Sequence, residues 1–446
     1  MAKIYYARVD EFWRKEQKYA YLEECQHVGN VEWQELKPDA KNNWLTEENS
    51  LDYETFFPLG SREAKSSQGF KVEAVFKTYS PGAQTNRDDW MFNFDSNALG
   101  SNVKRFINTY NEQVNKWITQ RKQGDTVDSF VSYDDSLIKW SSSLKAKLKA
   151  QASLSYKMEN VRQSFYRPYV AQYLYFDDAL THRRGQFHHF YPNSASEKAN
   201  IVIAVTGHSQ IPFSALTVNR IPSLDVGGRA GQCFPFYTYN EDGTNRRENI
   251  TDWALEQFRA HYKDQSITKW NIFHYVYALL HHPVYRECYA ANLKRELPRI
   301  PFAPDFQSFA HAGARLSELH VHYEQQPEYP LEAIETPNTA LDWRVEKMRL
   351  SKDKRSLVYN DFLTLGNIPP EIYEYRLGNR SALEWVIDQY QVSTDKRSGI
   401  TNDPNRADDP QYIKRLIGQV ITVSLETMKI VRALPALNIK TGGQEG

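Results

Sequence analysis

The first half of the chain has its hydrophobic residues in short runs separated by turn residues. Such runs predict β-strands, and they lie at residues 3–9, 72–80, 130–134, 173–177, 201–207 and 234–239. One amphipathic helix interrupts them at about residues 102–122, where apolar side chains recur at steps of three and four. Up to about residue 250 we therefore expect a mixed α/β structure built from short strands.

A polar, turn-rich stretch at residues 240–249 precedes a change of pattern, after which apolar residues recur with helical spacing. Residue types that start or end helices mark these segments. Thr251 caps one helix, Lys269 and Pro283 bound a second, Ser381 and Glu384 have capping-box spacing, and a last helix is predicted at residues 409–434. The prediction is a mixed α+β fold, with a short-stranded mixed α/β N-terminal half followed by a largely α-helical C-terminal half.

The composition favours a soluble, globular protein. Of the 446 residues, 41% are hydrophobic and 13% are aromatic, which is enough for a large core. The three cysteines form no CxxC pair, so neither a disulfide framework nor a zinc ribbon is indicated, and we expect a cytoplasmic location. No apolar run approaches the roughly 18 residues of a membrane span, so no membrane partner is expected.

The charges balance over the whole chain but not along it. With 55 basic and 55 acidic residues, no global field points to a nucleic-acid partner. However, acidic residues are in excess at residues 1–60, and basic residues are in excess at residues 139–190. The neutral chain therefore contains one distinctly basic region.

Catalytic motifs are weak. Asp39 and Glu63 could hold Mg²⁺ while Lys65 steadies an attacking water, which makes a divergent Mg²⁺-dependent nuclease an alternative function. This match is short and lies in a region rich in acidic residues, so coincidence is the simpler explanation. The sequence has no Walker loop, no GxGxxG and no complete nucleophile elbow. We therefore predict no catalytic residue in this chain.

Histidine pairs could suggest a metal site, because imidazoles are common metal ligands. The pairs are His188 with His189, His281 with His282, and His320 with His322. None of them has a convincing third ligand nearby in the sequence, so we predict no metal site.

Two loop-like stretches place Thr-Asn-Arg next to aromatic residues. Asn can bridge adenine N6 and N7, and Arg can bridge guanine O6 and N7, so such loops are suited to reading base edges. They are equally suited to ordinary turns. The candidates for base reading are Thr85, Asn86, Arg87, Arg246 and Arg247.

The stretch YRPYVAQYLYFDDALTHRRGQFHH at residues 166–189 predicts a strand whose tyrosines alternate with aliphatic residues. We expect this strand to be a packed scaffold, with function at its arginine-bearing ends. Upstream, lysines follow each other at two-residue steps. In an extended segment these lysines could all contact phosphates, whereas on a helix they would be solvent-exposed side chains without such a role. The phosphate candidates are Arg167, Arg183, Arg184, Lys145, Lys147 and Lys149.

Several longer stretches resemble the C-terminal region of type ISP single-chain restriction-modification enzymes. They are residues 4–22, 77–90, 166–177, 233–262 and 272–302, and the last two are the most specific. Proteins of that family join a nuclease, an ATP-driven translocase, an adenine-N6 methyltransferase and a target recognition domain in one polypeptide. The resemblance implies that residues 1–60 are the C-terminal edge of the methyltransferase-like domain. It also implies that residues 61–250 are a mixed α/β part, and residues 251–446 a helical part, of the recognition domain.

The resemblance implies sequence-specific binding of double-stranded DNA, which would direct adenine methylation and restriction. The motifs for S-adenosylmethionine, ATP and Mg²⁺ are expected only in the N-terminal domains of such an enzyme, so we expect no cofactor here. The expected partners are DNA and the polypeptide that carries the methyltransferase, helicase and nuclease. A second alternative to DNA recognition is a helical protein-interaction module of a split restriction-modification system.

Overall fold

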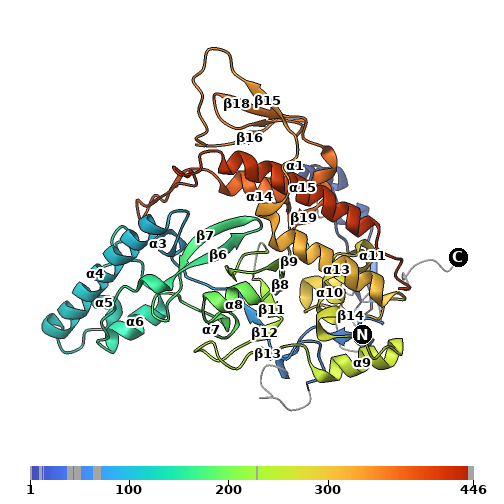
Figure 1. The fold of residues 1–446 in the computed structure, drawn as a ribbon, viewed down its shortest axis with the longest axis horizontal. Coiled ribbons are helices and arrows are strands. Elements are labelled where there is room, and N and C mark those ends of the chain that lie inside the picture. Colours follow the sequence, from blue (N-terminus) through green and yellow to red (C-terminus); the bar gives the residue numbers. More distant parts are fainter. Residues whose placement is uncertain are drawn as a thin grey trace. The chain divides into compact units, whose positions relative to one another are not determined.

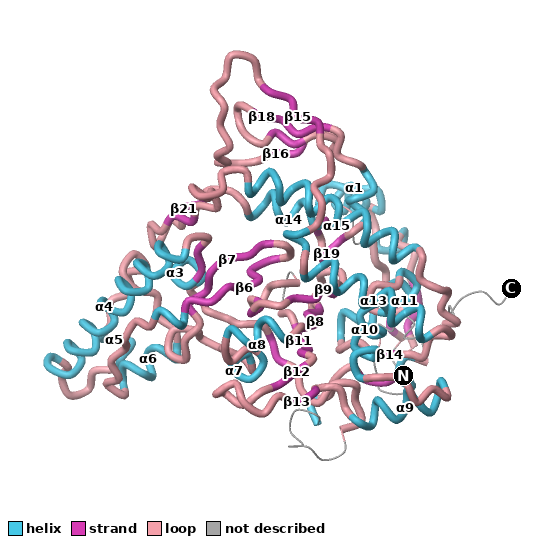
Figure 2. The backbone as a smooth tube through the Cα atoms, in the orientation of Figure 1, coloured by secondary structure: helices cyan, strands magenta, loops and turns pink. Residues whose placement is uncertain are grey.

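The computed structural model describes residues 3–9, 13, 15–37, 44, 52–63, 72–227 and 230–439. Helices and several small sheets alternate along these residues, as Figures 1 and 2 show, so the predicted mixed α/β class is confirmed. The chain divides into two compact units, Met1–Leu51 with Gly442–Gly446, and Asp52–Thr441. The three domains expected from the sequence, and the functions assigned to them, stay predictions.

The described residues of the smaller unit form a two-stranded sheet, an α-helix and a short 3-10 helix (Val28–Asn30). β1 (Ile4–Tyr6) pairs antiparallel with β2 (Gln34–Leu36), which confirms the first part of the strand expected at residues 3–9. α1 (Lys15–Cys25) contains no buried residue. Large apolar side chains of this unit are therefore at its surface, among them Tyr5, Leu22 and Trp33.

A group of helices in the larger unit surrounds α4 (Ser96–Gln120), which confirms the helix expected at about residues 102–122 as far as Gln120. Asp95 caps α4, and one face of the helix is buried, with Phe106 and Tyr110 at its centre. The strand expected at residues 130–134 is wrong. Thr126 and Ser129 form a capping box that starts α5 (Val127–Phe130), and residues 131–134 form a loop after it. The neighbouring helices are α3 (Asp88–Met91) and α6 (Ser142–Lys149).

The tyrosine-rich stretch forms the centre of a four-stranded sheet. β6 (Val161–Arg167) and β7 (Val170–Tyr175) are antiparallel, and Tyr169 sits in the turn between them at a φ of 59°. Tyr169 and Tyr175 are fully buried, so the strand is a packed scaffold as predicted. The outer strands are β5 (Phe92–Asn93) and β10 (Ile221–Pro222).

A second four-stranded sheet has the order β4-β11-β8-β9. Every residue of β8 (Val202–Val205) and β9 (Ala215–Val218) is buried, and β11 is Gln232–Pro235. The strands expected near residues 201–207 and 234–239 are therefore confirmed. Of the run at residues 72–80, only Ser80, in β4 (Ser80–Pro81), joins a strand, and Phe76 makes an isolated bridge to Ile250.

The helical segments beyond residue 250 follow the predicted start signals. Thr251 caps α9 (Asp252–Tyr262), and Ser381 with Glu384 forms the capping box of α14 (Ala382–Gln389). Pro283, however, opens a new helix instead of ending α10. The other helices are α10 (Lys269–Leu279), α11 (Pro283–Cys288), α12 (Ala290–Arg295), α13 (Phe306–Val321) and α15 (Tyr412–Arg432).

The C-terminal half also contains strands that the sequence did not indicate. Four of them form a sheet in the order β15-β18-β17-β16, namely β15 (Glu332–Glu335), β16 (Arg349–Leu350), β17 (Leu357–Val358) and β18 (Leu363–Gly366). Two short hairpins follow, β19 (Arg376–Leu377) with β20 (Arg380–Ser381), and β21 (Ser393–Thr394) with β22 (Thr401–Asn402). None of the helices that the structure describes is long and apolar enough to cross a membrane.

A buried polar network joins the strand turn to the helices. Nε2 of His320 lies 2.8 Å from the hydroxyl of Thr427 and 3.3 Å from that of Tyr375, whose hydroxyl lies 2.8 Å from that of Tyr169. Burial, with a contribution from the nearby Arg286, lowers the pKa of His320 to about 3. The imidazole is therefore neutral, and it ties α13, α15 and the β6–β7 turn into one core.

Candidate nucleic-acid interface

The loop at residues 82–87 exposes only one of its three candidate base readers. Thr85 is buried, and its hydroxyl donates to Asp88 while accepting from the backbone nitrogen of Arg87 at 3.1 Å. Asn86 is exposed in a left-handed conformation, with a φ of 59°. Its side-chain oxygen accepts from Gln84 at 2.8 Å, so the amide is held outward with its NH₂ group available.

Arg87 points into the core. Its side chain has no exposed surface, lies over the Phe106 ring and donates to the Leu180 carbonyl at 3.4 Å and to the hydroxyl of Ser141. Burial lowers the pKa of this guanidinium to about 10. Because a base reader must reach the surface, the roles predicted for Arg87 and for the buried Thr85 do not fit this structure.

Replacing Arg87 with alanine should therefore lower stability and not specificity. The change removes two buried hydrogen bonds and leaves a cavity, so we expect a loss of about 2 kcal/mol or more in the free energy of unfolding. Urea unfolding followed by tryptophan fluorescence measures this loss. A variant with wild-type stability that no longer distinguishes DNA sequences would instead make Arg87 a base reader.

The second Thr-Asn-Arg motif remains at the surface. It connects β12 (Tyr237–Thr238) to β13 (Arg247–Glu248), which form a short antiparallel hairpin. Arg246 and Arg247 are both exposed, and the Arg246 guanidinium lies 4.7 Å from the centre of the Tyr237 ring. This cation–π contact favours one orientation of the arginine at an exposed hairpin.

The three candidate lysines lie on a helix, so the helical alternative left open by the sequence is the one observed. In α6, Lys145 donates to Asp128 and, at 2.9 Å, to the hydroxyl of Tyr133. Lys147 donates to Asp178 at 3.1 Å, and Lys149 is exposed. Because successive lysines at two-residue steps point to different sides of a helix, they do not form one row.

Lys147 instead joins two arginines in a basic cluster, defined here as Lys147, Arg183 and Arg184. Asp178 accepts from Lys147 and forms an ion pair with Arg184 at 3.1 Å. The hydrogen bond from Lys147 lowers the pKa of Asp178, and Arg184 adds to this effect although burial opposes it. Asp178 contacts two of the three cations, and the adjacent Arg183 is exposed, so the cluster keeps a net positive charge.

The basic cluster borders the loop that carries Asn86. The backbones of Arg183 and Gln84 exchange two hydrogen bonds of 2.9 Å each. Arg167 approaches the same loop from the strand turn, because it stacks on Tyr166 at 4.1 Å and the Tyr166 hydroxyl donates to Asp88 at 3.2 Å. The structure therefore places the segments that carry Arg167 and the basic cluster next to the loop that carries Asn86, whereas Lys145 contacts Asp128 of α5 and Tyr133.

Two contributors to this surface were missed in the sequence. Gln84 orients Asn86, and Asp178 holds Lys147 and Arg184 in place. Neither residue belongs to a motif. The lysine that Asp178 binds is 31 residues away, so no local signal could have identified its role.

The nuclease alternative has little support from the described residues. Asp39 and Lys65 lie outside them. Glu63 is exposed, and backbone and Ser61 hydrogen bonds lower its pKa. A lowered pKa in a solvent-exposed carboxylate fits ordinary hydrogen bonding and does not by itself indicate a metal centre.

A sequence model described as the Type ISP C-terminal specificity domain matches residues 74–418. The chain belongs to this family. The resemblance noted in the sequence is therefore confirmed, and the interface residues Asn86, Arg167, Arg246 and those of the basic cluster all lie within the matched region. No curated protein matches the chain.

Solved structures of Type ISP enzymes, and of one further DNA complex, share the fold of this specificity domain. A nuclease-deletion mutant of the Type ISP restriction-modification enzyme LlaGI, in complex with a DNA substrate mimic, has 31% identity and a TM-score of 0.85. The DrdV–DNA complex has 35% identity and a TM-score of 0.83, and the ATP-dependent Type ISP enzyme LlaBIII bound to DNA has 29% and 0.81. Each match covers 98% of this chain but only 39%, 44% and 28% of the respective relative, so the chain spans less than half of these proteins.

Proposed function

We propose that this chain binds double-stranded DNA sequence-specifically, as the target recognition part of a restriction-modification enzyme that methylates adenine and cleaves DNA. The observation that carries the proposal is the match of 98% of the chain to three proteins whose structures contain DNA or a DNA mimic. The exposed Asn86 beside a basic cluster, and the exposed Arg246 and Arg247 on a hairpin, add a chemical reason.

Positioning and reading would be separate tasks. The basic cluster and Arg167 neutralise phosphates and fix the register of the protein on the duplex, which carries no sequence information. Asn86, Arg246 and Arg247 enter a groove and contact base edges, for which an amide and a guanidinium have suitable donor patterns. Arg246 is already oriented by Tyr237, so less side-chain freedom is lost on binding.

The chemistry would belong to other parts of such an enzyme. We propose that S-adenosylmethionine, ATP and Mg²⁺ are used by methyltransferase, helicase and nuclease domains that act together with this chain, in the cytoplasm. The adenine must leave the base stack before methyl transfer, and this chain contributes by holding the duplex at the correct site. This chain would recognise the DNA sequence and would catalyse no reaction itself.

Two lysines of α6 offer a matched test of this arrangement. Lys145 and Lys147 are each paired with an aspartate, but only Lys147 belongs to the basic cluster. The preferred site is first selected from random duplexes. Binding of the full chain and of Lys147→Gln, Lys145→Gln, Arg183→Gln and Arg246→Gln variants is then titrated against salt on cognate and scrambled DNA.

We expect Lys147→Gln and Arg183→Gln to weaken binding to both duplexes alike and to reduce the slope of log affinity against log salt by about 0.9 per lost contact. Lys145→Gln should change neither quantity. Arg246→Gln should cost about 1–3 kcal/mol on the cognate duplex and much less on the scrambled one. If the wild-type chain selects no sequence, the proposed function fails. If Lys145 matters and Lys147 does not, DNA lies on another face.

A further inference from the structure

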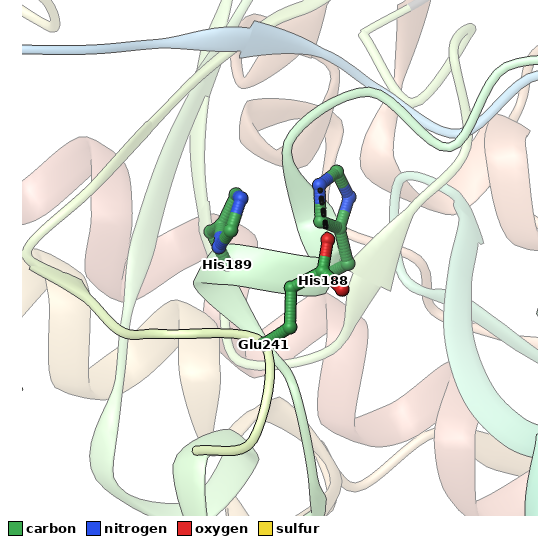
Figure 3. A group of neighbouring side chains, drawn as sticks. All are labelled: His188, His189 and Glu241. Atoms are coloured by element: carbon green, nitrogen blue, oxygen red, sulfur yellow. Dashed lines mark ion pairs between the residues drawn. The ribbon is translucent and has the colours of Figure 1, made fainter. Parts of the chain in front are cut away.

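The fold brings a third metal-binding side chain to the His188–His189 pair. Both histidines lie on α7 (Phe187–Phe190), whose two phenylalanines are buried and fix the helix in the core. Glu241, from the loop that follows β12, approaches the histidine side of α7 (Figure 3). One ligand atom from each residue lies within 4.8 Å of the others.

Neighbouring hydrogen bonds hold one imidazole ready to bind. Nδ1 of His189 lies 3.2 Å from the carbonyl oxygen of Tyr239, and the Tyr239 backbone nitrogen donates to the His189 carbonyl at 2.8 Å. Donation from Nδ1 to a carbonyl leaves the Nε2 lone pair available, which is the usual arrangement behind a metal-bound histidine. The same two contacts place Glu241, only two residues after Tyr239, beside the pair.

The geometry of His188 and Glu241 matches two ligands of a tetrahedral ion. Nε2 of His188 lies 3.4 Å from a carboxylate oxygen of Glu241. Zinc bonds of about 2.0–2.2 Å at tetrahedral angles separate two ligand atoms by about 3.3–3.6 Å. The ligand atom of His189 lies within 4.8 Å of the other two, and rotations of the His189 ring and of the Glu241 side chain, which is 65% exposed, would bring the three atoms to bonding positions.

The charges of the three side chains suit a divalent cation. Glu241 contributes one negative charge, and imidazole binds a metal ion in its neutral form.

We propose that His188, His189 and Glu241 form a binding site for a Zn²⁺-like divalent transition-metal ion. Two imidazoles and one carboxylate are a ligand set that Zn²⁺ accepts, with water in a fourth position on the solvent side. The ion ties α7 to the loop at residues 240–246 and so restrains the hairpin that carries Arg246. The binding of the ion does not depend on the proposed DNA function.

The sequence could not have revealed this site, because the histidine pair and Glu241 are more than 50 residues apart. The contact exists only because the Tyr239 backbone docks on His189. Among the described residues, the other two histidine pairs belong to no group of three possible metal ligands, although His322 lies 3.6 Å from Glu318.

The test is metal binding by the full chain after chelator treatment and dialysis. Isothermal titration with Zn²⁺ should show one equivalent bound, and titration with Co²⁺ should give the visible absorption bands of a tetrahedral ion. Loss of a supporting residue around a metal site weakens binding by about 10–100-fold, so loss of a direct ligand in Glu241→Gln or His189→Gln should weaken it by at least about 100-fold. Glu256→Gln, which changes an exposed glutamate of α9, should leave the affinity unchanged.

Hydrogen exchange provides a second measurement. Zn²⁺ should slow amide exchange at residues 240–246 in the wild-type chain but not in Glu241→Gln. Because Glu241 is exposed, this variant folds even if His189→Gln does not, and it decides the question alone. Absence of stoichiometric binding, or equal binding by Glu241→Gln and the wild type, would overturn the proposal and leave the cluster as an ion pair.

Discussion

Replacing Gly313 with alanine should destabilise the chain by more than about 3 kcal/mol, at the upper end of overpacking effects. Gly313 is a buried residue of α13 at its contact with α10. An added Cβ would lie 1.8 Å from the carbonyl oxygen of His274. Since the obstructing atom belongs to the backbone of a helix, it cannot rotate away, and the two helices must move apart.

A second helical glycine provides the control. In α4, a Cβ added to Gly100 would meet the Tyr156 hydroxyl at 2.8 Å, which is the tip of a movable side chain. The gain of about 1 kcal/mol in helix propensity on replacing Gly by Ala offsets this contact, so Gly100→Ala should change stability by less than about 1 kcal/mol. Urea unfolding of both variants measures the difference. A Gly313→Ala variant as stable as the control would mean that α10 and α13 are not in backbone contact.

Helices that begin at a capping residue could be predicted from the sequence. Short strands that exist only because they pair with distant segments could not. Thr251 and the Ser381–Glu384 pair start helices with bonds to residues three positions away, and both helices are present. The strand predicted at residues 130–134 is absent, because the capping box of Thr126 and Ser129 starts a short helix that ends at Phe130. The strands β15 to β18 have two to four residues each and are defined by pairings such as Glu332 with Gly366, which no hydrophobic alternation indicates.

At the candidate site too, contacts with residues distant in the sequence decide what a local motif cannot show. Two Thr-Asn-Arg motifs look alike in the sequence, yet Arg87 is buried and Arg246 is exposed. The difference comes from Ser141 and Leu180, which lie far along the chain and accept the hydrogen bonds of Arg87. Burial depends on the tertiary fold, so a motif alone could not distinguish a structural arginine from a surface arginine. The family, in contrast, could be inferred from the sequence, because the resemblance extends over many positions and does not depend on the burial of any single residue.

An ion pair in a polar pocket connects three separate elements of the larger unit. Arg220, which follows β9, donates to Glu324 at 2.8 Å, and the side chains are only 21% and 25% exposed. Glu324 belongs to a short 3-10 helix (Tyr323–Gln325), and its other oxygen accepts from the Tyr412 hydroxyl at 2.7 Å. Because Tyr412 begins α15, this carboxylate links the second sheet to the last helix.

We expect Glu324→Gln to lower the free energy of unfolding by about 3 kcal/mol at neutral pH. This magnitude lies between that of an exposed ion pair and the roughly 3–5 kcal/mol lost when one partner of a fully buried pair is removed. The cost arises because Arg220 keeps its charge in a poorly solvated position. Removing both partners in Arg220→Met/Glu324→Gln should recover part of the loss, since no unpaired charge remains. A double-mutant cycle from urea unfolding measures the coupling.

The pH dependence of this difference identifies its origin. Burial alone would raise the pKa of Glu324, but Arg220 and the Tyr412 hydroxyl outweigh it and lower the pKa below its usual range, which is near 4.3 in the unfolded chain. A group with a lowered folded-state pKa stabilises the fold fully above the unfolded value and stops doing so as the pH falls through the folded value. The wild type should therefore lose its advantage over Glu324→Gln as the pH drops below about 4.3. A difference that stays constant from pH 7 to pH 3 would show that the variant is destabilised by altered packing and not by loss of the ion pair.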